Sequence, residues 1–366
     1  MQQHARGVAS ASASRGTTLT SLAAPGLDEK PLQNLQEKAT TQAGTAAIRN
    51  SIFARYYTAE PFVDRLATSP DGAIDVIIPV LNSNELWEQN LSSIYREIPV
   101  NRLLIGNGGC VDDTLAVAER FPRVKVYDHT SFKTLGYSVK ELIEAVETEW
   151  FAYLHADVYL PDGWFDTMRR HQAELDWFGC PMRLTVLLEY LHHHPDRPYA
   201  GSQMGRKAAF VGGLDHIDDD YVYRQEDFVF TRLVEDGGFR HGKVEDTFHY
   251  HQVMPLLYGA GKRTRKLKSV DFAVETTPAE DLHTAETQLR GTIKYLRPDK
   301  FQIEAVNANI SRLKKLGSFD FDEFIAWVGR TNPEWLSHVP RPGTLIRNSL
   351  KSIVRRGLKY LLYKLD

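Results

Sequence analysis

The sequence is short of three features that mark large classes of protein: cysteine, long apolar runs and an excess of charge of one sign. Its only two cysteines, Cys110 and Cys180, lie far apart, which excludes a disulfide framework and fits a reducing compartment such as the cytoplasm. No apolar run approaches the roughly 20 residues that span a bilayer, and no apolar stretch of a signal peptide follows the first arginine. With 44 basic and 47 acidic residues, the net charge of −3 gives no global reason to expect a nucleic acid partner.

What the sequence does contain is enough apolar material for a full core. The chain has 366 residues, 42% of them hydrophobic, which leaves room for more than one domain. Residues 1–27 are rich in Ala, Ser, Thr and Gly and are expected to be disordered. We expect four further regions: a partly helical arm at 28–71, an α/β domain at 72–270, a helical region at 271–343, and a basic amphipathic helix at 344–366.

Short apolar runs alternate with helical periodicity from residue 74 onward. The runs predict buried strands at 74–80, 101–109, 124–129 and 150–157, and the periodic segments predict helices at 87–98, 112–121 and 139–146. Strand–helix alternation at this spacing predicts a mostly parallel sheet with helices on both faces. In such sheets ligands bind beyond the carboxyl ends of the strands, so the informative residues are expected directly after the apolar runs.

Four segments with chemical character follow the predicted strands in order. They read IPVLN (78–82), GNGGCVDDT (106–114), LHADVYLPDGW (154–164), and a block from GRKAAFVGGLD (205–215) to QEDFVFTRLVEDGGFR (225–240). Together they resemble glycosyltransferase family 2 over roughly residues 74–251. The resemblance implies a GT-A fold and an inverting transfer of a sugar from a nucleotide diphosphate-sugar to an acceptor hydroxyl.

The segment LHADVYLPDGW resembles the metal-binding motif of that family. A divalent cation neutralises a departing diphosphate, and Mn²⁺ or Mg²⁺ favours carboxylate ligands. The resemblance places the principal ligand at Asp157, puts His155 where the family has a first acid, and adds His251 from FHYHQ (248–252). The plainer alternatives are that Asp157 caps the turn before Pro161 and that His251 is structural.

The pair Glu226-Asp227 resembles the acidic pair that supplies the catalytic base in the family. An acceptor hydroxyl is a poor nucleophile, so a carboxylate must take its proton as the new bond forms, and Asp227 aligns with that base. Alternatively, both residues are acids favoured by the positive end of a helix.

The resemblance also assigns residues to the two substrates. The segments after the first two strands, with one arginine, are expected to bind the donor nucleotide: Pro79, Asn82, Glu85, Asn107, Gly108, Asp112 and Arg206. The segment GRKAAFVGGLD is expected to shape the acceptor and donor-sugar side through Gly212, Gly213 and Asp215. Asp112 also fits a helix cap, and Arg206 also fits a solvated cation.

Two other functions compete with the transferase. A nucleotidyltransferase would carry a Gly-rich, Arg-containing phosphate loop after its first strand, and VIIPVLNSNE has neither residue. A catalytically decayed GT-A domain used for binding or assembly is the alternative, because His155 and Asn107 stand where the family has acids.

The C-terminal segment 344–366 divides into an apolar and a basic stripe at helical spacing. The apolar stripe comprises Ile346, Leu350, Ile353, Val354, Leu358, Leu361, Leu362 and Leu365, and the basic stripe comprises Arg347, Lys351, Arg355 and Lys359. Such a helix can lie at an anionic membrane surface, which would suit a lipid-linked or other glycan acceptor. The alternative is that it packs on this protein's own helices or on a second subunit.

Overall fold

The structure, a computed structural model, describes residues 61–83, 87–184, 199–220, 222, 225–251, 264–266, 273–275, 278–316 and 319–339. The predicted disordered segment 1–27, most of the arm 28–71 and the predicted helix 344–366 lie outside these residues. The expected boundaries after residues 270 and 343 also fall outside them. The limits of the domains therefore remain predictions.

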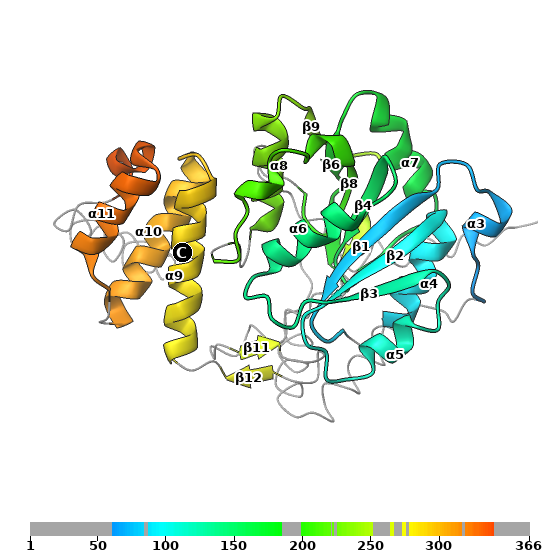
Figure 1. Ribbon diagram of the computed structural model, residues 1–366, viewed down its shortest axis with the longest axis horizontal. Helices are drawn as coiled ribbons and strands as arrows, with labels where there is room; N and C mark the ends of the chain where they lie inside the picture. Colours follow the sequence, from blue (N-terminus) through cyan, green and yellow to red (C-terminus); the bar gives the residue numbers. More distant parts are fainter. Residues whose placement is uncertain are drawn as a thin grey trace, which may run out of the picture.

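A seven-stranded sheet forms the centre of the molecule (Figure 1). Its order is β3-β2-β1-β4-β8-β6-β9, and β8 alone runs antiparallel to both of its neighbours. The strands are β1 (Ile74–Val80), β2 (Val100–Asn107), β3 (Val124–Asp128), β4 (Trp150–Leu154), β6 (Trp177–Gly179), β8 (Ser202–Arg206) and β9 (His241–Lys243). All four predicted strands are present, and β2 and β4 end before their predicted limits, so the residues after them lie in loops.

Helices cover both faces of the sheet, as predicted. One face carries α4 (Trp87–Glu97), α5 (Thr114–Ala118) and α7 (Trp164–Arg170), and the other carries α6 (Leu135–Ala145) and α8 (Glu226–Asp236). Because side chains alternate along β1, Val76 and Ile78 pack in the core under α4, α5 and α7, and Ile77 packs in the core under α6 and α8. Each such side chain, fully buried, contributes about 1.5–3 kcal/mol. The predicted α/β class with a mostly parallel sheet is confirmed.

A small second sheet lies against the main domain. It pairs β5 (Val158–Tyr159), β10 (His249–His251) and β7 (Met182–Leu184), with β10 antiparallel to β5 and parallel to β7. Because only three residues separate β4 from β5, this sheet holds β10 close to the end of a central strand.

The helical C-terminal region predicted after residue 270 is present. It contains α9 (Pro278–Tyr295), α10 (Lys300–Leu316), α11 (Phe321–Thr331) and the 3₁₀ helix η6 (Pro333–Ser337), preceded by the hairpin β11 (Thr264–Lys266) and β12 (Ala273–Glu275). These helices have a core of their own, and Leu296 joins Ile217, Val222 and Val229 in a second cluster against α8. Short elements elsewhere are α3 (Arg65–Thr68), η2 (His171–Ala173), η3 (Lys207–Ala209) and η4 (Leu214–His216).

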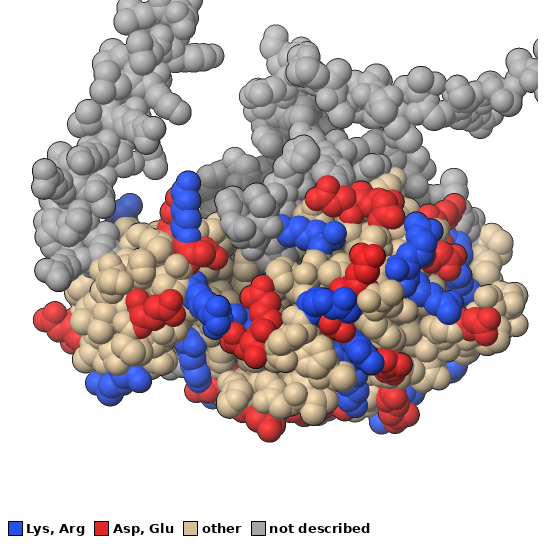
Figure 2. Space-filling model, turned by 90° about the horizontal axis from the view of Figure 1, so that it is seen from above, with Lys and Arg blue, Asp and Glu red and all other residues tan. Residues whose placement is uncertain are grey.

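Surface charge is mixed in sign. On the described part of the face in Figure 2, basic and acidic side chains alternate without a large area of one sign. Among the described residues, no helix has the length and apolar character needed to cross a membrane.

Asp75 is a fully buried acid at the start of β1. Its carboxylate accepts from Arg102 at 2.5 Å, from the Asn101 amide at 2.8 Å and from the Glu147 backbone N–H at 2.7 Å. Burial alone would raise the pKa of Asp75, but these donors outweigh it and lower the pKa below its ordinary value. The ionised form is therefore stabilised in the folded state.

Asp75→Asn should lower the free energy of unfolding by about 2–3 kcal/mol at pH 7, because it removes the buried charged acceptor of Arg102, Asn101 and the Glu147 N–H, while Arg102 keeps only its pair with the exposed Glu147 carboxylate. Because the folded pKa is depressed, this stabilisation exists above the unfolded pKa of about 3.9 and disappears as pH falls through the folded pKa. Urea titrations of wild type and variant from pH 7 to pH 3 measure this difference in the free energy of unfolding. The control is Asp162→Asn, which removes a 95% exposed partner of Arg96 and should change stability by less than about 1 kcal/mol. Equal losses in both variants at pH 7 would contradict the account.

Candidate active site

The turn after β4 is held from two sides. The His155 backbone N–H donates to the Gly201 carbonyl at 3.0 Å, and the Asn90 side chain of α4 donates to the Ala156 carbonyl at 3.0 Å. Both bonds fix the backbone of His155 and Asp157 beyond the carboxyl end of a central strand. This is the place where the sheet topology predicts a ligand.

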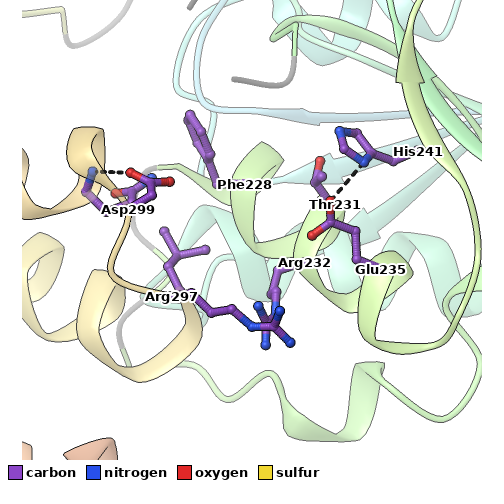
Figure 3. A pocket seen from close by; sticks show the side chains of 9 residues that line it. Phe228, Thr231, Arg232, Glu235, His241, Arg297 and Asp299 are labelled. Atoms are coloured by element: carbon purple, nitrogen blue, oxygen red, sulfur yellow. Dashed lines mark hydrogen bonds and ion pairs between the residues drawn. The ribbon is translucent and has the colours of Figure 1, made fainter. Parts of the chain in front are cut away.

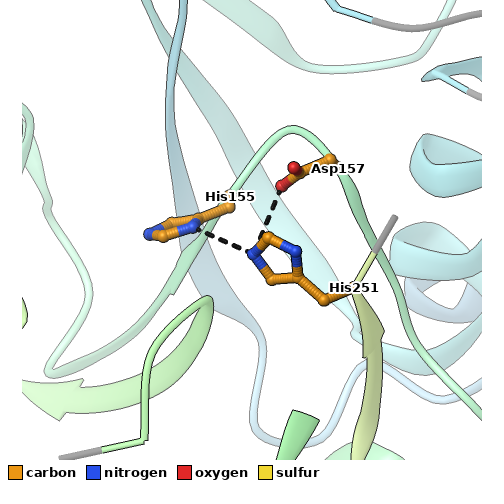
Figure 4. Close-up of side chains that lie close together, drawn as sticks. All are labelled: His155, Asp157 and His251. Atoms are coloured by element: carbon orange, nitrogen blue, oxygen red, sulfur yellow. Dashed lines mark hydrogen bonds and ion pairs between the residues drawn. The ribbon is translucent and has the colours of Figure 1, made fainter. Parts of the chain in front are cut away.

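His251 reaches the same turn from β10. His251 pairs with Val158 where β10 meets β5. The Nε2 atom of His251 lies 3.5 Å from Asp157 Oδ1 and 3.4 Å from His155 Nδ1 (Figure 4). Gly201 permits this approach, because a Cβ at that position would stand 2.8 Å from the His251 ring. Its φ of 94° is also a conformation that favours glycine. The structure thus brings together the three predicted metal ligands.

Glu226 and Asp227 begin α8 and are 4% and 6% exposed. Glu226 Oε1 lies 3.4 Å from His155 Nε2 and accepts from the Tyr153 hydroxyl at 3.1 Å. Asp227 Oδ1 accepts from the side-chain amide of Gln203. Acids are favoured at a helix N-terminus, but burial with three specific polar partners goes well beyond that preference. The acidic pair and the histidine–aspartate cluster therefore share His155.

The electrostatics of this group separate the two acids. Burial would raise the pKa of Glu226, but His155 and the Tyr153 hydroxyl hold it below the ordinary value. Burial and the neighbouring charge of Glu226 raise the pKa of Asp227 to about 7. Burial alone would lower the pKa of His155, yet the bond to Glu226 and the charges of Asp227, Glu226 and Asp157 raise it to about 9. Asp227 therefore titrates near neutral pH, as a general base requires.

The donor atoms fit a divalent cation. His155, Asp157 and His251 offer atoms within 4.8 Å of one another, and so do His155, Glu226 and Asp227. Ligand atoms about 2.1 Å from an octahedral ion lie about 3 Å apart, so the separations of 3.4 and 3.5 Å need little adjustment. Two imidazoles beside one carboxylate suit Mn²⁺ better than Mg²⁺, which prefers oxygen ligands.

The loops after β1 and β2 are joined to each other at the same edge. The Gly108 N–H donates to the Val80 carbonyl at 2.9 Å, and the Val111 N–H donates to Asn82 Oδ1 at 2.8 Å. Asn107 Oδ1 accepts from the N–H groups of Gly109 and Cys110. This oxygen therefore shapes the turn, and the Asn107 amide nitrogen is left as the group that can meet a ligand.

Asn82 adopts a φ of 53°, a left-handed conformation that asparagine tolerates. Pro79 belongs to β1, one residue before the strand ends. Asp112 accepts from the Thr114 N–H at 3.1 Å just before α5, whose N-cap residue is Asp113. Glu85 lies outside the described residues.

Other predicted residues are not brought to this edge. Arg206 ends the antiparallel strand β8, beside Trp150 at the start of β4, and pairs with Glu149 at 2.9 Å. Gly213 packs against Leu233, about two helical turns along α8 from Glu226. Its neighbour Gly212 and the nearby Asp215 are exposed.

Sequence reasoning missed Tyr153 and Gln203, which support the acidic pair. They face each other across β4 and β8, so one side chain reaches Glu226 and the other Asp227. Tyr153 stands in an apolar strand and reads as core. The available signal is spacing: Tyr153 and His155 are two residues apart and share one face of the strand.

The family comparison supports the resemblance. Residues 75–177, from β1 to the start of β6, match the model of Glycosyl transferase family 2. The observed mostly parallel sheet with helices on both faces agrees with the GT-A fold that the resemblance implies. The match includes His155 and Asp157 and ends before Glu226. No curated protein matches the sequence.

Several solved structures are similar at low identity. TarS 1–349 of S. aureus in complex with UDP-GlcNAc has a TM-score of 0.45 and 13% identity, covering 73% of this chain and 81% of its own. The mannosyltransferase PcManGT from Pyrobaculum calidifontis, with GDP-Man and Mn²⁺, has a TM-score of 0.43 and 13% identity over 87% and 99%. Glucosyl-3-phosphoglycerate synthase from Mycobacterium tuberculosis, with Mn²⁺, UDP and phosphoglyceric acid, has a TM-score of 0.40 and 15% identity over 55% and 78%. Likeness of this degree does not define a donor or metal for this chain.

We predict that Mn²⁺ affinity rises about tenfold per pH unit from pH 7.5 to 8.5. With a pKa of about 9, His155 is protonated in the metal-free protein and must release one proton to become a ligand. Calorimetric titration in buffers of different ionisation enthalpy measures the affinity and the proton release together. The matched variant His155→Asn should lose this slope while keeping Asp157 and His251. A wild-type affinity that does not change over this range would exclude His155 as a ligand.

Proposed function

Residues 75–177 carry a glycosyl transferase family 2 sequence, and from this premise we propose that the chain is an inverting, metal-dependent glycosyltransferase. It moves a sugar from a nucleotide diphosphate-sugar to a hydroxyl of a glycan or lipid-linked acceptor. One observation carries the proposal: a carboxyl group titrating near pH 7, Asp227, stands within one polar cluster with three residues suited to a divalent cation.

Asp157, His155 and His251 would hold Mn²⁺ or Mg²⁺ at this edge of the sheet. A divalent cation there would supply Lewis-acid stabilisation of the departing diphosphate. The nucleoside side of the donor would lie over the joined loops after β1 and β2, where the backbone at Gly108 allows close approach and the Asn107 amide nitrogen can donate to a base.

Asp227 would act as the base. As the acceptor oxygen bonds to the anomeric carbon, the bond from that carbon to the diphosphate oxygen breaks and the acceptor proton passes to Asp227. Attack on the face opposite the leaving group inverts the configuration. Glu226 stays ionised beside His155, and its charge keeps the pKa of Asp227 high enough to hold a proton.

The competing function is a decayed domain that binds without catalysis. His155 in place of an acid favours it. The buried pair Glu226 and Asp227 argues against a decayed domain. Burying two adjacent acids destabilises the fold, so their presence favours a catalytic role. Hydrolysis of donor in the presence of Mn²⁺ distinguishes the two, since a scaffold should show none.

Asp227→Asn should lower kcat by about 10²–10⁴-fold and leave the donor Kd unchanged, because the base acts on the acceptor. Asp157→Asn should instead remove Mn²⁺-dependent binding of UDP or GDP. A screen of UDP-, GDP- and dTDP-sugars by thermal shift identifies the donor for both assays. The control Asp166→Asn, on the exposed side of α7, should match wild type. A loss below tenfold in folded Asp227→Asn would place the base elsewhere, and wild-type Mn²⁺-dependent binding in Asp157→Asn would remove it from the metal site.

We further propose that segment 344–366 binds the inner surface of a membrane, where a lipid-linked acceptor would be available. Its apolar stripe would enter the headgroup boundary and its basic stripe would face anionic lipid. Each cation near such a surface contributes about 1 kcal/mol, so four together are enough for association.

The full chain should sediment with liposomes containing phosphatidylserine and lose this binding as salt rises, while a chain ending at Pro342 should stay in solution. Liposomes of phosphatidylcholine alone are the control for charge. Equal sedimentation of both chains, or binding that does not depend on lipid charge, would indicate that the segment packs against protein instead.

A further inference from the structure

A second polar pocket lies between α8 and the turn that joins α9 to α10 (Figure 3). Its volume is about 240 Å³, and its lining combines an aromatic wall with hydrogen-bonding groups: Phe228, Thr231, Arg232, Glu235, His241, Leu296, Arg297, Asp299 and Gln302. The four residues from α8 follow the spacing i, i+3, i+4 and i+7, which forms one stripe of the helix. None of the lining residues belongs to the proposed metal, base or nucleotide sites.

Gln302 is the feature that points to a ligand. It is 1% exposed, and within the described part of the chain neither its amide nitrogen nor its amide oxygen has a hydrogen-bond partner. Its backbone N–H is bonded to Asp299, so the side chain is held at the pocket while its own polar atoms stay unsatisfied. A buried amide in this state destabilises the fold unless a bound molecule supplies the missing donor and acceptor.

The charges around the pocket are balanced. Arg232 Nε and Arg297 Nη2 bind the two oxygens of Asp236 at 2.6 and 3.0 Å. The carboxylate of Glu235 lies 2.9 Å from His241 Nδ1. The two guanidinium groups share the single carboxylate of Asp236, and Glu235 and Asp299 add two further acids to the lining, which disfavours a phosphate or a nucleotide as the occupant. A neutral ligand with several hydroxyl or amide groups matches this lining.

We propose that this pocket binds one neutral sugar ring of a glycan. A ring of this kind can lay its C–H face on Phe228 and Leu296 and exchange hydrogen bonds through its hydroxyl groups with Gln302, Asp299 and the arginine N–H groups not used by Asp236. The volume is below the roughly 300–1,000 Å³ of pockets for larger ligands, so it accepts a single ring rather than a nucleotide-sugar. The ligand class is inferred from the pocket, so binding does not require the proposed transferase activity.

The position of the pocket on α8 would let an enzyme that acts on glycans hold its substrate near the acidic pair. The stripe that lines the pocket continues the helix whose first turn carries Glu226 and Asp227. A glycan held here would be anchored on the catalytic helix and away from the reacting atoms. This use rests on the proposed function, whereas sugar binding itself does not.

Saturation-transfer NMR with the full chain tests the site, using the methyl glycosides of glucose, galactose, mannose and N-acetylglucosamine as probes at millimolar concentration. At least one probe should bind, and Gln302→Met should weaken it at least tenfold. Because Met fills the same space without unpaired polar atoms, this variant should melt at or above the wild-type temperature. Arg297→Met, whose side chain is 64% exposed in the wild type, should weaken the same probe without unfolding. Gln288→Met, on α9 outside the pocket, is the matched control and should bind as wild type.

The proposal and the transferase function fail in different ways. Binding retained in Asp157→Asn places the sugar outside the metal site, and unchanged binding in the presence of inorganic phosphate supports a neutral occupant. The proposal is overturned if no probe binds, if Gln302→Met and Arg297→Met bind as wild type, if Asp157→Asn abolishes binding, or if phosphate displaces the sugar. None of these results alters the donor hydrolysis that tests the transferase.

Discussion

The interaction on which the site depends is the contact of His155 with the buried acids Glu226 and Asp227. Two adjacent carboxylates with almost no solvent repel each other, and burial penalises both charges. An imidazole 3.4 Å from Glu226 stabilises one charge, and the other acid responds by keeping its proton to about pH 7. The same ring faces His251 with its other nitrogen, so in the proposed mechanism a single side chain would connect proton transfer with metal binding.

The scaffold holds that contact from three directions. The strand pair β4 and β8 presents Tyr153 and Gln203 to the two acids, and Gly201 lets the histidines of β10 approach the turn after β4. Helix α8 starts from Gln225 in a left-handed conformation with φ of 66°. The Thr292 hydroxyl of α9 lies 3.3 Å from the side-chain oxygen of Gln225. The C-terminal helices therefore contact the left-handed residue that directly precedes Glu226 and Asp227.

Much of this arrangement could be predicted from sequence, for a physical reason that also explains the failures. Parallel strands bring their carboxyl ends to one edge, so Asp157 and the loops after β1 and β2 could be placed together from the order of apolar runs. Arg206 is the last residue of the antiparallel strand β8, whose carboxyl end lies at the opposite edge, and periodicity does not reveal strand direction. Tyr153 and Gln203 act through contacts distant in sequence, and the pocket at Gln302 is assembled from separate elements, which no local pattern records.

The central claim is that one cluster of residues at the carboxyl edge both holds a divalent cation and presents a base. Anomalous scattering from crystals grown with Mn²⁺ and a nucleoside diphosphate tests it most directly. We predict a single strong peak coordinated by Asp157, His155 and His251, with the diphosphate on its open side and Asp227 free to meet an acceptor. A peak bound by Glu226 and Asp227 without Asp157, or no peak at this edge with nucleotide bound, would contradict the account.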